Sequence, residues 1–183
     1  MNLTLRQMLR ASYVNRWHII NVVKPQSVAE HTFNVCLISE YICKLINDNQ
    51  SAIDVYKYAL HHDIPEVIIG DIPTPAKALL GLNKSSQIDE LCYQMDQWSI
   101  CPDPNVKRII KLADYVDAIT YLALNGVGKQ ATDVRNGIIH MAIEHLANSG
   151  FSNSDQITLK GWLDHVSTWD TQEAGEKGVT WYR

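Results

Sequence analysis

Hydrophobic and polar positions along most of this chain recur at the spacing of α-helices. Between Ser27 and about Ile46, apolar side chains return every three or four residues, which gathers them on one helical face. The series Ser27-Val28-Ala29-Glu30 has the form of a capping box and predicts where this helix begins. A shorter amphipathic segment over residues 3–12 precedes it.

Further helices are predicted from the same periodicity and from capping residues. Ser51 is a candidate N-cap for a helix that runs into His62 and Asp63, and Pro65 should disturb or end that helix. Pro75 should start the next helix. The remaining predicted helices span about 86–98, 106–124, 132–147 and 154–166.

The segment 106–124 is apolar around much of its circumference, so it should lie at the centre of the fold. Asp103-Pro104 supplies its N-cap and first-turn proline, and Asn125-Gly126 ends it. No strand-period alternation with hairpin turns is present in the sequence. We therefore predict one all-α domain over residues 1–183, a bundle of about seven or eight helices. Its tail over 171–183 should be loose or dock on a neighbour.

Composition narrows the class of protein. With 183 residues, of which 46% are hydrophobic, the chain can bury a sizeable core and is not disordered. Sixteen basic against twenty acidic residues give a net charge of −4, which argues against an electrostatic nucleic-acid binder. No leader segment and no membrane-spanning apolar run is evident, so we expect a cytoplasmic protein with no membrane partner. Four cysteines without a C-x-x-C pair are expected to be small buried hydrophobic residues: Cys36, Cys43, Cys92 and Cys101.

The chemistry of the sequence centres on His62 and Asp63. A neutral imidazole beside a carboxylate can supply two ligands to one divalent metal ion. Glu66 follows three residues after Asp63, close enough to handle a proton of a bound water. Because a His-Asp dipeptide is frequent by chance, the assignment requires further ligands elsewhere in the chain.

Two isolated residues can complete such a ligand set. His31 lies in the first turn of a predicted helix, among apolar neighbours. Asp114 lies in the middle of the most apolar helix, where a buried carboxylate requires a cation nearby. That cation is either Lys111, one helical turn earlier, or a metal ion, and Asp117 is the competing carboxylate. Each residue alone also has a structural explanation, as a core histidine or as a simple ion pair.

In their order along the chain, four motifs resemble those of the HD-domain phosphohydrolases. The motifs are Glu30-His31, His62-Asp63-x-x-Glu66, Gly70-Asp71-Ile72-Pro73-Thr74-Pro75-Ala76-Lys77 and Lys111-Leu112-Ala113-Asp114. The resemblance is to the branch that contains bacterial 5′-deoxynucleotidases and phage dATP triphosphohydrolases. It begins at Asn15-Arg16-Trp17 and extends to about residue 122. It implies a single HD-domain with its metal and nucleotide site within residues 15–120.

The resemblance also implies a role for the motif residues. One divalent metal ion (Co²⁺, Mn²⁺, Zn²⁺, Fe²⁺ or Mg²⁺) would have four protein ligands: His31, His62, Asp63 and Asp114. Glu66 would act on the proton of the attacking water or of the leaving group. His18 and His61 match no role in the family and are expected to be structural.

The substrate that the resemblance implies is a deoxynucleotide. Arg16 would hold the α-phosphate, for which a guanidinium group is well shaped, and Trp17 would crowd the sugar C2′ and exclude ribonucleotides. Asp71 would accept a hydrogen bond from the 3′-hydroxyl, while Lys77 and Lys111 would stabilise charge on phosphate oxygens. Attack at the α-phosphorus fits both monophosphates, which yield phosphate, and triphosphates, which yield tripolyphosphate.

Between these substrates our hypothesis is a preference for dATP. The chain is compact like the phage enzymes, and Ile19 stands where they place an aliphatic side chain against adenine. The alternatives are a 5′-deoxynucleotidase that acts on dNMPs, a non-catalytic nucleotide-sensing module and, less favoured, a cyclic-nucleotide phosphodiesterase. As in the family, we expect a homo-oligomer, a dimer or a larger ring, in the cytoplasm of a bacterium or of a phage-infected cell.

Overall fold

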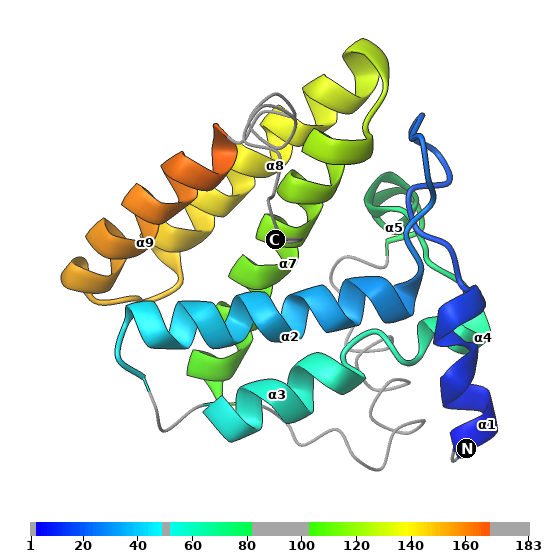
Figure 1. The fold of residues 1–183 in the computed structure, drawn as a ribbon, viewed down its shortest axis with the longest axis horizontal. Coiled ribbons are helices and arrows are strands. Elements are labelled where there is room, and N and C mark those ends of the chain that lie inside the picture. Colours follow the sequence, from blue (N-terminus) through cyan, green and yellow to red (C-terminus); the bar gives the residue numbers. More distant parts are fainter. Residues whose placement is uncertain (1–2, 49–51, 82–102, 169–183) are drawn as a thin grey trace, which may run out of the picture.

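The computed structural model describes residues 3–48, 52–81 and 103–168. Within these ranges the chain forms helices and no named β-strand, which confirms the predicted all-α class (Figure 1). None of the described helices is long and apolar enough to cross a membrane. That all 183 residues form one domain stays a prediction. Several predictions concern residues that lie outside the described ranges: Ser51, the helix over 86–98, Cys92, Cys101 and the tail over 171–183.

The described chain starts with α1 (Leu5–Met8), which passes directly into the 3₁₀ helix η1 (Leu9–Tyr13). A loop then leads to α2 (Val28–Leu45), whose N-terminus carries the predicted capping box. The Ser27 hydroxyl accepts a hydrogen bond from the Glu30 N–H at 3.1 Å, and the Glu30 carboxylate accepts one from the Ser27 N–H at 2.8 Å. Two neighbouring side chains therefore determine where α2 begins.

The middle of the chain forms α3 (Ala52–His61), α4 (Glu66–Ile69) and α5 (Thr74–Leu79). Because α3 ends at His61, the following His62 and Asp63 lie in the turn between α3 and α4 rather than on a helix. Pro65 was predicted to disturb or end α3; α3 instead ends at His61, and Pro65 stands at the N-cap of α4.

The central helix is α7 (Pro104–Asn125), as predicted, and it packs against α2, α3, α8 and α9 (Figure 1). Asp103 caps α7 by accepting a hydrogen bond from the Asn105 N–H at 2.7 Å. Ile109 and Leu112 on α7 are fully buried in the hydrophobic core that these helices share. The apolar circumference of this helix is thus explained by neighbours on several sides.

Helices α8 (Gly128–Asn148) and α9 (Asn153–Ser167) pack against each other and against α7. α8 begins four residues earlier than predicted, almost directly after α7. Gly126 permits this close turn, because a Cβ at that position would lie 2.6 Å from the Leu122 carbonyl oxygen and 2.9 Å from the Ala131 Cβ.

Helix α2 also carries buried thiols and an exposed apolar stripe. Cys36 and Cys43 are buried and free, as predicted. Phe33, Leu37 and Tyr41 are half exposed or more, at a spacing of four residues along α2. The predicted homo-oligomer stays a prediction.

Candidate functional site

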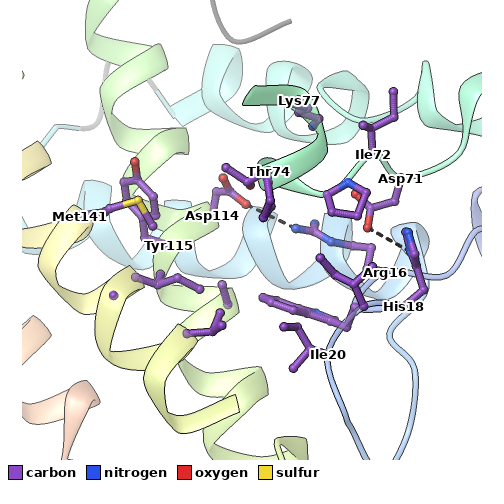
Figure 2. A pocket seen from close by; sticks show the side chains of 18 of the residues that line it. Arg16, His18, Ile20, Asp71, Ile72, Thr74, Lys77, Asp114, Tyr115 and Met141 are labelled. Carbon is purple, nitrogen blue, oxygen red and sulfur yellow. Dashed lines mark ion pairs between the residues drawn. The ribbon is translucent and has the colours of Figure 1, made fainter. Parts of the chain in front are cut away.

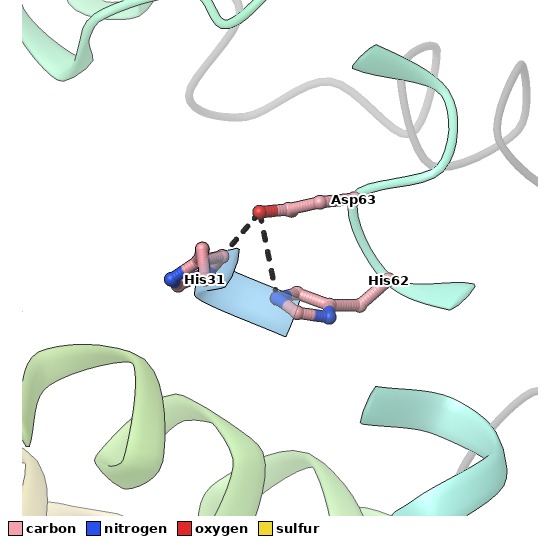
Figure 3. Close-up of side chains that lie close together, drawn as sticks. All are labelled: His31, His62 and Asp63. Atoms are coloured by element: carbon pink, nitrogen blue, oxygen red, sulfur yellow. Dashed lines mark ion pairs between the residues drawn. The ribbon is translucent and has the colours of Figure 1, made fainter. Parts of the chain in front are cut away.

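Three predicted metal ligands meet where α2 passes the turn between α3 and α4 (Figure 3). His31 projects from α2, and His62 and Asp63 project from the turn. One ligand atom from each residue lies within 4.8 Å of the other two. The Nε2 atoms of His31 and His62 lie 3.2 and 3.5 Å from the same oxygen, Oδ2 of Asp63. Three potential metal-ligating atoms therefore lie close to one another.

The second ring nitrogen of each histidine has its own partner. His31 Nδ1 lies 2.6 Å from Asp117 Oδ2, and His62 Nδ1 lies 2.7 Å from the Ala59 carbonyl oxygen. Because both of these oxygens accept a hydrogen bond from Nδ1–H, each ring in its neutral form presents the lone pair of Nε2 toward Asp63. Both Nε2 atoms are buried and have no hydrogen-bond partner within the described structure. This arrangement fits the binding of a metal cation.

Electrostatics favour a cation at the same point. Burial lowers the pKa of His31, but its contacts with Asp117 and Asp63 outweigh burial and raise that pKa to about 9. Burial raises the pKa of Asp63, yet the neighbouring imidazoles and Arg16 hold it well below its usual value. A divalent cation bound here would replace the proton on the ligating nitrogen of His31.

Asp114, the fourth predicted ligand, lies at the edge of this trio. Its Oδ1 is 3.6 Å from His31 Nε2 and 3.7 Å from Arg16 Nη2, while its Oδ2 accepts a hydrogen bond from Lys111 Nζ at 2.6 Å. Burial raises the pKa of Asp114, but the charges of Lys111, His31 and Arg16 lower it below its usual value. The structure thus places Asp114 beside His31, with two side-chain cations already in contact.

The Arg16 guanidinium bridges two of the predicted ligands. Its Nη1 lies 3.4 Å from Asp63 and its Nη2 lies 3.7 Å from Asp114. Burial lowers the pKa of Arg16, but the charges of these carboxylates outweigh burial and raise that pKa above its ordinary value, so the guanidinium stays charged. Both contacts are longer than a close guanidinium–carboxylate pair. A partly buried, charged group with such loose contacts is well suited to bind a phosphate.

Glu66 is the first residue of α4, and its side chain is buried. Its Oε1 lies 3.9 Å from Lys77 Nζ, and its Oε2 has no hydrogen-bond partner among the described residues. Burial, together with the charges of Asp63 and Asp71, raises the pKa of Glu66 to about 8. A carboxyl group that titrates near neutral pH can take up or release a proton during a reaction.

A pocket of about 480 Å³ adjoins these groups (Figure 2). Figure 2 shows Arg16 and Asp114 pointing toward each other, with Met141 and Tyr115 on one side of the pocket and His18 and Asp71 on the other. This volume is in the range of small-molecule sites. The charged lining residues are Arg16, Asp63, Glu66, Asp71, Lys77, Lys111 and Asp114. The apolar lining residues include Ile19, Ile20, Ala118, Val134, Ile138 and Met141.

Trp17 forms part of the pocket wall and is held on two sides. Its indole N–H donates a hydrogen bond to Gln26 Oε1 at 3.0 Å. Its ring stacks on Tyr121, with ring centroids 5.6 Å apart and an interplanar angle of 9°. Trp17 therefore both packs on the core and lines the pocket, and its contact with the sugar stays a prediction.

His18, for which the sequence indicated no role, also lines the pocket. Its Nδ1 lies 3.9 Å from Asp71 Oδ2. Asp71 and the half-exposed Ile19 line the pocket as well. His18 was expected to be structural, and that expectation stays a prediction, but the structure places the residue in the wall of the pocket. Its position next to Trp17 in the sequence was the available signal.

Two further residues support the site in roles that the sequence did not indicate. Asp117, expected only as a competing ligand, instead bonds His31 Nδ1. Its position one helical turn after Asp114 was the available signal. Gln26 contacts both Trp17 and Asp117, and its loop offers no periodic pattern that would have indicated this.

The sequence is similar to those of known phosphohydrolases. A family model described as 5′-deoxynucleotidase YfbR-like matches residues 4–100. The chain is 34% identical to a dATP triphosphohydrolase of Salmonella phage PMBT28 over 148 residues, which is 75% of this chain and 75% of the relative. It is 33% identical to a 5′-deoxynucleotidase of Yersinia pestis (strain Pestoides F) over 72 residues, which is 37% of this chain and 36% of the relative.

Among solved structures, the fold is similar to that of the HD phosphohydrolase DatZ of cyanophage S-2L. The TM-score is 0.80 at 25% sequence identity, and the match covers 91% of this chain and 98% of the other. The DatZ structure contains dA and one catalytic Zn²⁺ ion.

Proposed function

Because the chain belongs to the YfbR-like 5′-deoxynucleotidase family, we propose that it is a metal-dependent deoxynucleotide phosphohydrolase that prefers dATP. Water would attack the α-phosphorus, and the products would be deoxyadenosine and triphosphate. One observation carries the proposal. His31 and His62 each direct a buried Nε2 with no hydrogen-bond partner in the described structure toward Asp63, beside a pocket of about 480 Å³.

The residues present fit one divalent cation. His31, His62 and Asp63 would hold it, and Asp114 would complete the ligand set from α7. Zn²⁺ is the ion we propose, because it accepts imidazole and carboxylate ligands and because DatZ contains Zn²⁺. When bound, such an ion supplies Lewis-acid polarisation of a phosphate oxygen and lowers the pKa of the attacking water.

Side chains of the pocket would carry the proton and the substrate. Glu66, whose pKa is raised to about 8, would take the proton of the attacking water. Arg16 would exchange its long contacts with Asp63 and Asp114 for the α-phosphate. Lys77, which also lines the pocket, would stabilise charge on the phosphate oxygens.

The nucleoside would occupy the rest of the pocket. Trp17 would lie against the sugar C2′, and Asp71 would accept a hydrogen bond from the 3′-hydroxyl. Ile19 would contact the adenine, and Lys111 would assist with the phosphates from its place beside Asp114. The presence of dA in the DatZ structure supports a deoxyadenosine ligand for this pocket.

A second candidate is a 5′-deoxynucleotidase that acts on dNMPs, because the same attack at the α-phosphorus serves both substrates. The family model favours this alternative by its description. The extent of the similarity favours the triphosphate. The phage dATP triphosphohydrolase matches 75% of the chain, whereas the Yersinia 5′-deoxynucleotidase matches 37%.

The test is turnover by the purified chain, stripped of metal and reloaded with Zn²⁺ or Mn²⁺. Each dNMP, each dNTP and ATP are incubated separately, with His62→Ala protein as the inactive control. Nucleosides are separated by reversed-phase chromatography, and phosphate and triphosphate are separated by ion exchange. We expect deoxyadenosine and triphosphate in equal amounts from dATP. Release of nucleosides from monophosphates alone would favour the 5′-deoxynucleotidase, and tight binding of dATP without turnover would favour a sensing module.

A further inference from the structure

Gln26 occupies an unusual position between the pocket and the metal ligands. It lies in the loop before α2 and is only 2% exposed. Its side-chain Nε2 donates hydrogen bonds to both carboxylate oxygens of Asp117, at 3.2 and 3.0 Å. Its Oε1 accepts the indole N–H of Trp17 at 3.0 Å, and its backbone carbonyl accepts the N–H of Arg16 at 2.8 Å. One buried residue thus contacts three parts of the site.

The chemistry of its neighbours fixes the orientation of the Gln26 amide. The indole nitrogen of Trp17 can only donate a hydrogen bond, so it must face the amide oxygen. The carboxylate of Asp117 can only accept, so it must face the amide nitrogen. A flipped amide would set acceptor against acceptor on one side and donor against donor on the other. Both side-chain contacts therefore require the same orientation of the amide, and a flip of the amide would lose both.

Asp117 connects Gln26 to the predicted metal ligand His31. Its Oδ2 lies 2.6 Å from His31 Nδ1, and its Oδ1 also accepts a hydrogen bond from Asn34 at 2.8 Å. Asp117 is 1% exposed and His31 is 0% exposed, so water does not replace these contacts. The rotation of the His31 ring, and hence the direction of its Nε2, depends on where Gln26 and Asn34 hold Asp117.

Trp17 needs such support because its backbone is strained. Its φ of 67° lies in the left-handed region, which a bulky residue adopts only when its surroundings enforce it. The stack on Tyr121 and the hydrogen bond to Gln26 both hold the indole against the pocket. The stack limits the plane of the ring, and the hydrogen bond limits its rotation within that plane.

We propose that Gln26 is a positioning residue that orients the sugar-facing wall at Trp17 and, through Asp117, the metal ligand His31. The part that concerns the sugar rests on the proposed function. Gln26 itself belongs neither to the residues that line the pocket nor to the predicted metal ligands. Its role is to keep two groups that must act on the same substrate in a fixed relation to each other.

The test substitution is Gln26→Leu, which keeps the approximate size of the side chain, removes both side-chain contacts and leaves the backbone bond to Arg16. Two quantities are measured on metal-stripped protein that is then reloaded. The first is the Zn²⁺ affinity, by competition with a chromogenic chelator. The second is the ratio of kcat/KM for dATP to that for ATP. We expect the Zn²⁺ affinity to fall about 10–100-fold and the ratio to fall about tenfold.

Two matched substitutions separate the arms of the network. Asn34→Leu removes a contact of Asp117 but none of Trp17, so it should lower the Zn²⁺ affinity and leave the dATP-to-ATP ratio unchanged. Trp17→Phe removes the indole N–H, so it should lower the ratio and leave the Zn²⁺ affinity within about twofold. Only Gln26→Leu should change both. Far-UV circular dichroism and thermal unfolding show that each variant is folded.

If folded Gln26→Leu protein keeps wild-type Zn²⁺ affinity and a wild-type ratio, the proposal is refuted. Should Gln26→Leu fail to fold, Gln26→Glu replaces it. That variant sets a second carboxylate against Asp117, so it should shift both quantities in the same direction. A wild-type protein that binds Zn²⁺ without hydrolysing any deoxynucleotide contradicts the proposed function instead. In that event the Zn²⁺ affinity, and the binding of dATP relative to ATP, decide the role of Gln26.

Discussion

Glu66→Gln should stabilise the metal-free protein by an amount that grows with pH. Burial and the charges of Asp63 and Asp71 raise the pKa of Glu66 to about 8 in the folded chain, against an ordinary value of 4.5. Between these two values the folded protein keeps a proton that the unfolded chain has released. The wild type therefore loses stability as pH rises from about 4.5 to about 8. A glutamine at this position does not titrate, so the variant escapes that loss.

The magnitude follows from the proton difference. One extra proton on the folded state changes the free energy of unfolding by about 1.4 kcal/mol for each pH unit. Between pH 6 and pH 8, where the carboxyl of Glu66 is still partly protonated, the wild type should lose about 2 kcal/mol relative to Glu66→Gln. Zn²⁺ should reduce this difference, because a dication beside Glu66 favours the charged carboxylate.

The assay is urea unfolding at 25 °C, followed by far-UV circular dichroism at pH 6, 7 and 8. Protein concentration and ionic strength are held constant, and EDTA is present. The control is Glu144→Gln on the exposed face of α8, which should show no such trend. The stability of Glu66→Gln relative to the wild type should rise steadily over this range. A difference that is the same at pH 6 and at pH 8 would contradict the raised pKa, whatever its size.

Three further predictions concern the site and the fold. His62→Ala should abolish Zn²⁺ binding, whereas Asp117→Asn should weaken it by about 10–100-fold, because Asp117 contacts the ligand His31 and is not itself a predicted ligand. Zn²⁺ affinity is measured by competition with a chelator. Equal losses of affinity in the two variants would contradict a supporting role for Asp117. Gly137 lines the pocket, whereas Gly161 does not. At both positions an added Cβ would have no atom of the described residues within 4 Å. Gly137→Leu should therefore lower kcat/KM for dATP, and Gly161→Leu should not. Gly126→Ala should destabilise the fold by about 1–3 kcal/mol in thermal unfolding, because its Cβ would meet backbone 2.6 Å away.

Helix boundaries followed from the sequence where the deciding contacts are local. Ser27 and Glu30 bond each other's backbone within one turn, so their order alone predicts the start of α2. The gathering of His31 with His62 and Asp63 is not local, and periodicity alone could not predict it. It was predictable because their order along the chain matched a known set of motifs. The end of α3 at His61, earlier than predicted, and the start of α4 at Glu66 were missed, because Pro65 was expected to disturb or end α3, whereas it stands at the N-cap of the next helix.

The supporting contacts of the site were beyond the sequence for a physical reason. His31 and Asp117 are 86 residues apart, and Gln26 and Asp117 are 91 residues apart. Whether their side chains meet depends on how α2 crosses α7, which no local pattern specifies. The loop that carries Gln26 and Trp17 has no helical period, and the positive φ of Trp17 departs from what its residue type favours. The position of His18 beside Asp71 depends on the conformation of the same loop.

His31 lies across α7 so that its two nitrogens face two carboxylates one helical turn apart. Nδ1 is 2.6 Å from Asp117, and Nε2 is 3.6 Å from Asp114. The position of α2 along α7 therefore decides which carboxylate supports the ring and which stands beside the ligating nitrogen. That position is held by core side chains such as Val35 on α2 and Leu112 on α7, both fully buried. A cation bound by His31 and Asp63 would thus stabilise the same packing on which its own binding depends, by about 2.7 kcal/mol at a hundredfold excess over Kd.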